Sequence, residues 1–256
     1  MQLGPEASRR GYRVASYEVL GSTSDEALAR VRAGEAGGLW IVAGEQTAGR
    51  GRFGRAWSSP RGNLHASLLL VDPTTPRLAP QLGFVAGIAL IEALHVSAPS
   101  APVQLKWPND VLSQGAKLAG VLVEGATLAN GKFAACIGFG VDCAHNPSGL
   151  AYPATNLAAL GINCTPERLF VALAESCAHW LDIWAGGAGF SKIRAQWLAH
   201  AASLGAPIRV GRGDHVLEGV FETIDDDGRL ILATPSGRTA LEAGELFPSG
   251  AALTNG

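Results

Sequence analysis

The chain has 256 residues, enough for one large domain or for a large domain joined to a small one. Its composition, 47% hydrophobic and 16% charged, supports a sizeable core and excludes an intrinsically disordered chain. The formal net charge of −2 argues against general binding of nucleic acid, so any basic cluster must act locally.

The first predicted helix begins near residue 22. Thr23 and Glu26 have the spacing of a capping box, and an apolar stripe at Ala27, Leu28 and Val31 follows them. Buried strands are then expected at 39–46 and 63–71, and the apolar segment 81–96 is expected to be a central buried helix. Three more strands are predicted at 103–107, 117–125 and 132–142.

Two further helices follow, one with Thr165 as its N-cap and Pro166 at its first position, the other spanning about 190–203. After Leu204 and Gly205 the pattern changes to short strands, expected at 207–211, 216–225, 229–235 and 239–247 and separated by turn sequences, which predicts a small β-barrel. The larger part lacks strict β-α alternation, so we predict an α+β fold with a mixed sheet. The expected divisions are an N-terminal tail (1–16), a main domain (17–204) and the small β domain (205–256).

The spacing of the cysteines and the lack of a long apolar run predict a cytoplasmic protein. The four cysteines show no C-x-x-C spacing, so buried free thiols are expected rather than a zinc site or a disulfide framework. No apolar run follows the basic residues of the N-terminus, so no signal peptide is predicted. The longest apolar candidate, Leu78–Ile91, is shorter than the ~20 residues that span a membrane.

Residues 47–63 combine a G-x-G-x-x-G pattern with four arginines and Trp57. A dinucleotide-binding loop needs a helix directly after it, but Pro60 and Gly62 break the short segment before the next strand. No G-K-[S/T] follows, which excludes a Walker loop. Glycine lets a backbone fold closely around a ligand, and arginine binds phosphate or carboxylate with a planar fork. We predict a mobile lid over a reactive intermediate, the alternative being a solvated basic loop.

Three segments together resemble the core motifs of bacterial biotin protein ligases. They are EQTAGRGRFGRAWSSPRGNLHASL (45–68), KWPNDVLSQGAKLAGVLVE (106–124) and IGFGVD (137–142). Residues 219–246 are similar to the small SH3-like barrel of that family, so the resemblance covers about 17–247.

The resemblance implies a reaction in two steps. Biotin and ATP give biotinyl-5′-AMP and pyrophosphate, and biotin is then transferred to a lysine of a biotin carboxyl carrier domain of acetyl-CoA carboxylase or a related carboxylase. Both steps bring negative charge together or develop it, so the site needs fixed cations and Mg²⁺.

The resemblance also implies which residues act. Lys117, Arg52 and Asp110 are the expected catalytic residues. A strand-end lysine reaching for water is the alternative for Lys117, and an Asx-turn residue is the alternative for Asp110. The implied biotin-binding residues are Ser22, Thr23, Ser24, Gln46, Arg50, Gly51, Arg52 and Lys117. Those implied for ATP and the adenylate are Arg50, Arg52, Arg55, Trp57, Asn109, Lys117 and Asp142, with the metal ligands left open.

Three positions depart from the usual pattern of the family. Ser24 and Asp142 stand where asparagine is usual, and His65 stands where tyrosine is frequent. A carboxylate accepts hydrogen bonds but has no amide N–H, so Asp142 either contacts the adenine differently, approaches Mg²⁺, or is a strand-end residue. His65 is expected to be a packed strand histidine.

Several alternatives stay open. A lipoate ligase or octanoyltransferase shares the fold, and a non-catalytic homologue would also explain the departures. A nucleic-acid module built on the lid arginines would belong to a different class. Because the resemblance starts near residue 17, we expect a monofunctional enzyme without a DNA-binding winged helix. A homodimer is compatible with the sequence.

Overall fold

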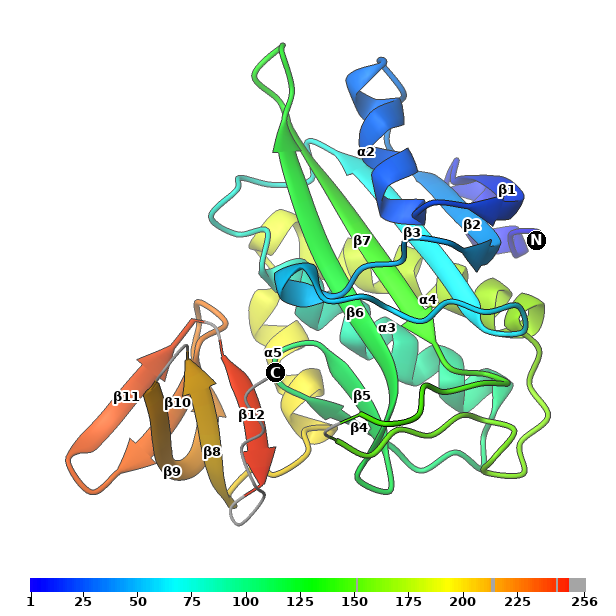
Figure 1. Cartoon of the computed structure of the whole chain (residues 1–256). Coiled ribbons are helices and arrows are strands. Elements are labelled where there is room, and N and C mark those ends of the chain that lie inside the picture. Colours follow the sequence, from blue (N-terminus) through cyan, green and yellow to red (C-terminus); the bar gives the residue numbers. More distant parts are fainter. Residues whose placement is uncertain (151, 213–214, 243, 249–256) are drawn as a thin grey trace.

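The computed structural model describes residues 1–150, 152–212, 215–242 and 244–248. Figure 1 shows a larger α+β part and a smaller β part. The larger part contains a seven-stranded sheet in the order β1-β2-β3-β7-β6-β5-β4. Its strands are β1 (Arg13–Leu20), β2 (Leu39–Gln46), β3 (Leu64–Val71), β4 (Val103–Lys106), β5 (Asp110–Ser113), β6 (Ala116–Thr127) and β7 (Phe133–Val141). The β1–β2 pair is parallel and the others are antiparallel, which confirms the predicted mixed sheet.

The N-terminal residues differ from the expected tail. Helix α1 (Pro5–Arg9) precedes β1, and β1 begins at Arg13, so the sheet starts before residue 17. β1 lies at the sheet edge and none of its side chains is fully buried. Its sequence therefore lacks the apolar signal that marks an inner strand.

Helices cover both faces of the large sheet. Helix α2 (Thr23–Arg32) packs on one face, against Leu39 and Ile41 of β2. Helices α3 (Gln81–Ser97) and α4 (Pro166–Trp184) pack on the other, where Trp40 and Val42 point (Figure 1). This alternation along β2 follows from the two-residue period of a strand. α3 is buried almost all round, as predicted.

The helix starts show one error and one success. The N-cap of α2 is Ser22, whose hydroxyl accepts from the backbone N–H of Asp25, so the capping box expected at Thr23 and Glu26 does not form. Thr23 is already helical, and its hydroxyl contacts Gln46 and Ser67. Thr165 caps α4 as predicted, with Pro166 in the first turn.

The small part is an antiparallel sheet of five strands in the order β11-β10-β9-β8-β12. Its strands are β8 (Pro207–Arg212), β9 (His215–Ile224), β10 (Leu230–Thr234), β11 (Gly237–Leu241) and β12 (Glu245–Pro248). Within the described ranges the edge strands β11 and β12 do not pair, so the predicted barrel is not closed. The strand expected at 239–247 is divided into β11 and β12, which lie at opposite edges. Helix α5 (Phe190–Ala199) precedes this sheet.

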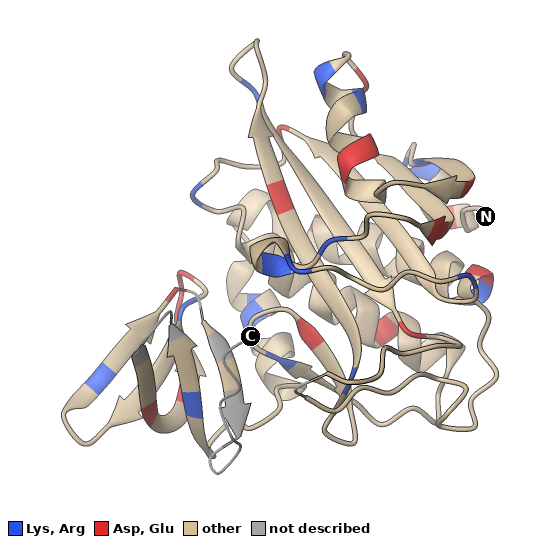
Figure 2. Cartoon of the chain, in the orientation of Figure 1, with Lys and Arg blue, Asp and Glu red and all other residues tan. Residues whose placement is uncertain are grey.

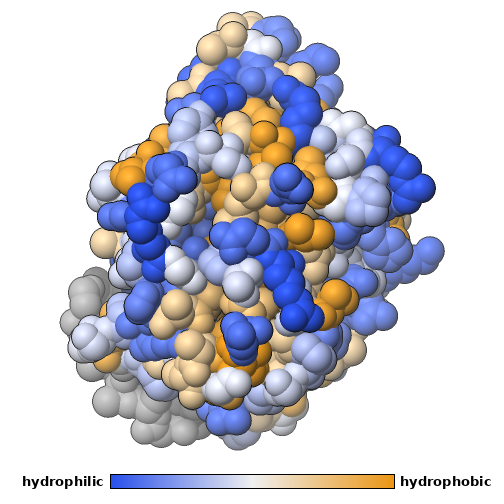
Figure 3. Space-filling view, turned by 90° about the vertical axis from the view of Figure 1, so that its right-hand side faces the viewer, coloured by the Kyte–Doolittle hydropathy of each residue, from blue (hydrophilic) through white to orange (hydrophobic). Residues whose placement is uncertain are grey.

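The surface in Figure 3 carries small groups of apolar side chains separated by hydrophilic ones, which is ordinary for a folded protein. No helix in the described part of the chain is long and apolar enough to cross a membrane. The four cysteines are free and buried, as predicted.

Candidate functional site

A cavity of about 290 Å³ opens on the face of the sheet that carries α2. It is bounded by the start of α2, the segment after β2, the K-W-P-N-D segment, and the strands β6 and β7. The structure thus brings together three motifs that are far apart in the sequence. The predicted residues that line the cavity are Ser22, Thr23, Ser24, Gln46, Arg50, Gly51, Arg52, Arg55, Trp57, Asn109, Asp110 and Lys117; Asp142 does not line it.

One end of the cavity is a network of hydroxyl and amide groups, called here the hydroxyl end. The N–H and hydroxyl of Thr23 donate to Gln46 Oε1 at 2.8 and 3.0 Å. Ser67 Oγ lies 2.8 Å from Thr23 Oγ1 and 3.0 Å from Ser24 Oγ. Gln46 Nε2 donates to Ser59 Oγ at 2.9 Å. Because each hydroxyl has one hydrogen, the bonds run from Ser24 through Ser67 and Thr23 to Gln46.

Sequence reasoning missed Ser59 and Ser67. Ser67 is fully buried in β3, whose other inward residues on both faces are mostly apolar. A hydroxyl inside such a strand needs a hydrogen-bond partner. A serine within this apolar segment was therefore the signal in the sequence that could have indicated a polar contact. His65 is packed in the same strand, with Nε2 3.1 Å from the Pro60 carbonyl oxygen, as expected. Burial lowers the pKa of His65.

Glycines form the floor of the cavity on β6 and β7. A Cβ atom at Gly138 would lie 2.9 Å from Ser24 Oγ, and one at Gly140 would lie 2.4 Å from Trp57 Nε1. At Gly120 it would lie 3.3 Å from the Trp57 ring. The G-F-G sequence of β7 therefore leaves room for the hydroxyl end beside Gly138 and for the tryptophan beside Gly140.

The segment 47–57, called here the lid, is a short hairpin. Trp57 N–H donates to the Gly49 carbonyl at 2.9 Å, and Gly51 N–H donates to the Arg55 carbonyl at 2.8 Å. Within the described residues between β2 and β3, the one helical element is a 3₁₀ turn, Arg52–Gly54. A dinucleotide-binding loop would need an α-helix there, so that interpretation is correctly rejected. Basic residues lie along the lid, and acidic residues of α2 and β6 lie near it (Figure 2).

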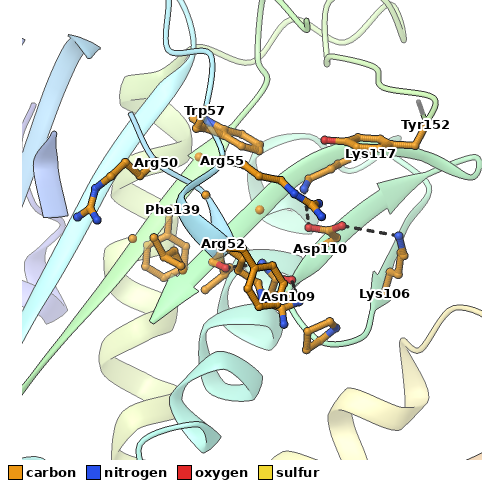
Figure 4. Close-up of a pocket in the computed structure, with 18 of the residues that line it drawn as sticks. Arg50, Arg52, Arg55, Trp57, Lys106, Asn109, Asp110, Lys117, Phe139 and Tyr152 are labelled. Carbon is orange, nitrogen blue, oxygen red and sulfur yellow. Dashed lines mark hydrogen bonds and ion pairs between the residues drawn. The ribbon is translucent and has the colours of Figure 1, made fainter. Parts of the chain in front are cut away.

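Lys117 is held among charged and aromatic groups. Its Nζ lies 2.7 Å from Asp110 Oδ1, and 5.2 and 5.5 Å from the ring centroids of Trp57 and Tyr152 (Figure 4). Lys106 Nζ lies 3.9 Å from the other oxygen of Asp110. Both members of the Lys117–Asp110 pair are largely buried, at 17% and 16% side-chain exposure. Lys117 is therefore not a lysine that extends into water, and Tyr152 is a neighbour that the sequence did not indicate.

The lid arginines point in different directions. Arg50 forms ion pairs with Asp25 and with Glu124, the latter at 3.2 Å, and Figure 4 shows it directed away from Lys117. Arg52 donates to Asn109 Oδ1 at 3.3 Å and to the Gly244 carbonyl at 3.2 Å. Arg52 thus connects the lid to the K-W-P-N-D segment and to the residue that precedes β12.

Asp142 lies outside the cavity lining and is 2% exposed. Its Oδ1 accepts from Asn63 Nδ2 at 3.0 Å, and Asn63 also binds the backbone of Ala144 and His145. Burial raises the pKa of Asp142 to about 7, an effect that the positive charge of Lys117 opposes. The Asp142 carboxylate therefore lies behind the cavity lining, close enough to Lys117 to be affected by its charge.

Comparison with known proteins shows the family of this chain. A family model described as "Biotin/lipoate A/B protein ligase family" matches residues 18–142, and one described as "Biotin protein ligase C terminal domain" matches residues 203–247. The biotin–[acetyl-CoA-carboxylase] ligase of Paracoccus denitrificans is 41% identical over 239 residues, covering 90% of this chain and 98% of that protein. The enzyme of the same name from Mycobacterium tuberculosis is 31% identical, covering 88% and 85%.

A solved structure titled as biotin protein ligase from Aquifex aeolicus in complex with biotin and ATP is also similar. Its TM-score is 0.77 at 26% identity, with coverage of 92% of this chain and 97% of that one. The chain therefore belongs to the biotin protein ligases within the biotin/lipoate A/B protein ligase family.

Proposed function

We propose that this protein activates biotin with ATP as biotinyl-5′-AMP and then transfers biotin to a lysine of a biotin carboxyl carrier domain. The relatives named above carry biotin ligase activity in their names, and one similar structure is titled with biotin and ATP bound. The observation that carries the proposal is the position of Lys117, paired with Asp110 beside a cavity that also contains the hydroxyl end.

In the first step the biotin ureido ring would bind at the hydroxyl end. Thr23, Ser24 and Ser67 present short hydroxyls beside Gln46, and these groups can both donate and accept hydrogen bonds. The valeryl chain would then cross the glycine floor toward Lys117. This arrangement directs the carboxylate of biotin to the cationic part of the cavity.

Adenylation joins two anions, because the biotin carboxylate attacks the α-phosphorus of ATP and pyrophosphate leaves. Lys117 would neutralise the carboxylate and the phosphate oxygens, with Arg52 as a second cation. Fixed charges of this kind stabilise a transition state without reorganisation, and removing one such donor typically costs about 10²- to 10³-fold in rate. Trp57 and Asn109 would line the adenine side, and Arg55 the polyphosphate.

Mg²⁺ would accompany the ATP phosphates. No group of three or more His, Cys, Asp or Glu side chains in the described ranges could hold a metal ion. Asp110 is the carboxylate that lines the cavity, and Mg²⁺ commonly binds through one or two carboxylates together with substrate phosphates. Asp110 fits such a role if nucleotide binding draws Lys117 away from it.

In the second step the amine of the carrier lysine attacks the acyl carbon of the adenylate, and AMP leaves. The incoming ammonium group must lose a proton before it can attack. Asp110 is positioned to accept that proton or to orient the amine, because its carboxylate lies at the cavity between Lys106 and Lys117. The carrier domain of acetyl-CoA carboxylase is the proposed partner, by analogy with the names of the relatives.

The test is substrate-dependent exchange of labelled pyrophosphate into ATP, followed by labelling of a carrier domain. The protein with ATP and Mg²⁺ is expected to catalyse exchange with biotin and not with lipoate, and to modify one lysine of the carrier. Exchange with lipoate alone would assign the protein to the lipoate branch. Absence of exchange with either acid would indicate a non-catalytic homologue.

A further inference from the structure

Phe53 occupies a conformation and an environment that both disfavour phenylalanine. It lies in the 3₁₀ turn of the lid at φ 57° and ψ 25°, in the left-handed region, which costs an L-residue roughly 1–2 kcal/mol. The residue is also 71% exposed. The turn is closed by backbone bonds between Gly51, Arg52 and Arg55, which require no aromatic side chain. Glycine would fit the backbone better, so the reason for phenylalanine must lie in its ring.

The ring of Phe53 contacts two guanidinium groups. The Cζ atom of Arg52 lies 4.7 Å from the ring centroid and that of Arg55 lies 5.9 Å from it. The face of an aromatic ring attracts cations, by about 0.5–1 kcal/mol for each exposed contact. One ring can therefore hold two like charges near each other that would otherwise repel. Both arginines line the cavity.

We propose that Phe53 is a positioning residue for adenylation, which orients Arg52 and Arg55 toward the polyphosphate of ATP before the nucleotide binds. This inference rests on the proposed function. Ordering a long side chain on binding costs roughly 0.5–1.5 kcal/mol, and a ring that orders two arginines beforehand removes part of that cost. The loss of the ring should therefore weaken ATP binding and leave biotin binding at the opposite end of the cavity intact.

The test compares Phe53→Ala, Phe53→Gly and Phe53→Tyr with the unmodified protein in biotin-dependent pyrophosphate exchange, varying ATP and biotin separately. The KM for ATP is expected to rise about threefold to tenfold in Phe53→Ala, with kcat and the KM for biotin within about twofold. Phe53→Gly should show the same defect even though it relieves the backbone, and Phe53→Tyr should keep the normal KM.

A second measurement separates this role from contact with the carrier. Preformed biotinyl-5′-AMP is supplied to each variant, and transfer to the carrier domain is followed at several carrier concentrations. Phe53→Ala is expected to transfer with an unchanged KM for the carrier. A defect confined to the carrier KM would overturn the inference, and so would an unchanged KM for ATP in Phe53→Ala. If the unmodified protein shows no exchange, the proposed function fails and this inference fails with it.

Discussion

The two ends of the cavity are built in different ways. At the hydroxyl end, Thr23 and Ser24 are 4% and 7% exposed, sit on a helix start, and bond to one another through Ser67 of β3. At the other end, called here the cationic end, Arg52 and Arg55 come from the lid and Lys117 from the start of β6. Arg50 of the same lid is 37% exposed and is neutralised by acidic neighbours.

The difference fits what the proposed function requires each end to bind. A neutral polar ring is bound by short groups fixed on rigid elements, because little conformational entropy is lost and unpaired hydroxyls would be costly. A polyanion needs charge, and long cationic side chains need counterions while the anion is absent. Asp110 supplies this counterion for Lys117. The hydroxyl end is therefore preformed, whereas ion pairs must be exchanged when substrate enters the cationic end.

The largest expected effect comes from removing the central charge of the cationic end. Lys117→Ala should lower the rate of adenylate formation at least about 100-fold, because the fixed cation is lost at the reacting groups. Pyrophosphate exchange measures this rate, and circular dichroism checks the fold. Lys132→Ala is the matched control, since Lys132 is exposed in the β6–β7 connection and its Nζ lies 4.0 Å from Asp72. Near-normal exchange by Lys117→Ala would remove Lys117 from the mechanism.

A methyl group on either floor glycine should disturb one end and spare the other. Gly138→Ala places its Cβ against Ser24 Oγ, which disturbs the hydrogen bond between Ser24 and Ser67. The KM for biotin should therefore rise about tenfold. Gly140→Ala places its Cβ against the Trp57 indole and should raise the KM for ATP by a similar factor, because the ring must move. Both values follow from exchange assays in which one substrate is varied at a time.

Gly83→Ala in α3 is the control for this pair, because its Cβ would meet only Val123 at an ordinary 3.9 Å. Neither KM is expected to change in that variant. If Gly138→Ala and Gly140→Ala alter both KM values equally, the two ends are not independent and the comparison is wrong.

The sequence predicted the parts of this site that depend on local patterns. The long apolar helix α3, the strand before the lid, and the absence of a helix after it follow from hydrophobic period and from Pro60 and Gly62. The early start of the large sheet was missed because the edge strand β1 carries a weak apolar signal. The open small sheet was missed because closure depends on whether β11 and β12 pair, which no local pattern specifies.

Contacts made through the fold were also beyond local patterns. Ser67 lies within the motif segment 45–68 but on its buried strand, and Tyr152 lies outside all three motif segments; their proximity to Thr23 and Lys117 exists only in the folded chain. The cap of α2 was assigned to Thr23 instead of Ser22 because both hydroxyls fit a cap by spacing alone. The resemblance implied a place near the adenine for Asp142, and no local pattern indicated that its carboxylate would accept a hydrogen bond from Asn63 outside the cavity lining.

The smallest expected effect on activity therefore belongs to Asp142, which lies at neither end. Asp142→Asn should leave the KM for biotin and for ATP within about twofold, and the amide oxygen can still accept from Asn63. A tenfold change in the KM for ATP would return Asp142 to the adenine side. Its main effect should appear in stability, measured by denaturant unfolding at several pH values.

The direction of that effect follows from the pKa of Asp142, which burial raises from 3.8 to about 7. Between these values the folded protein keeps a proton that the unfolded chain releases. The unfolding free energy of the unmodified protein thus falls as pH rises, by up to about 1.4 kcal/mol per pH unit. Asp142→Asn lacks this proton, so its stability relative to the unmodified protein should grow up to about pH 7 and then level off. A difference that does not vary with pH would mean that Asp142 is ionised in the folded protein throughout this range.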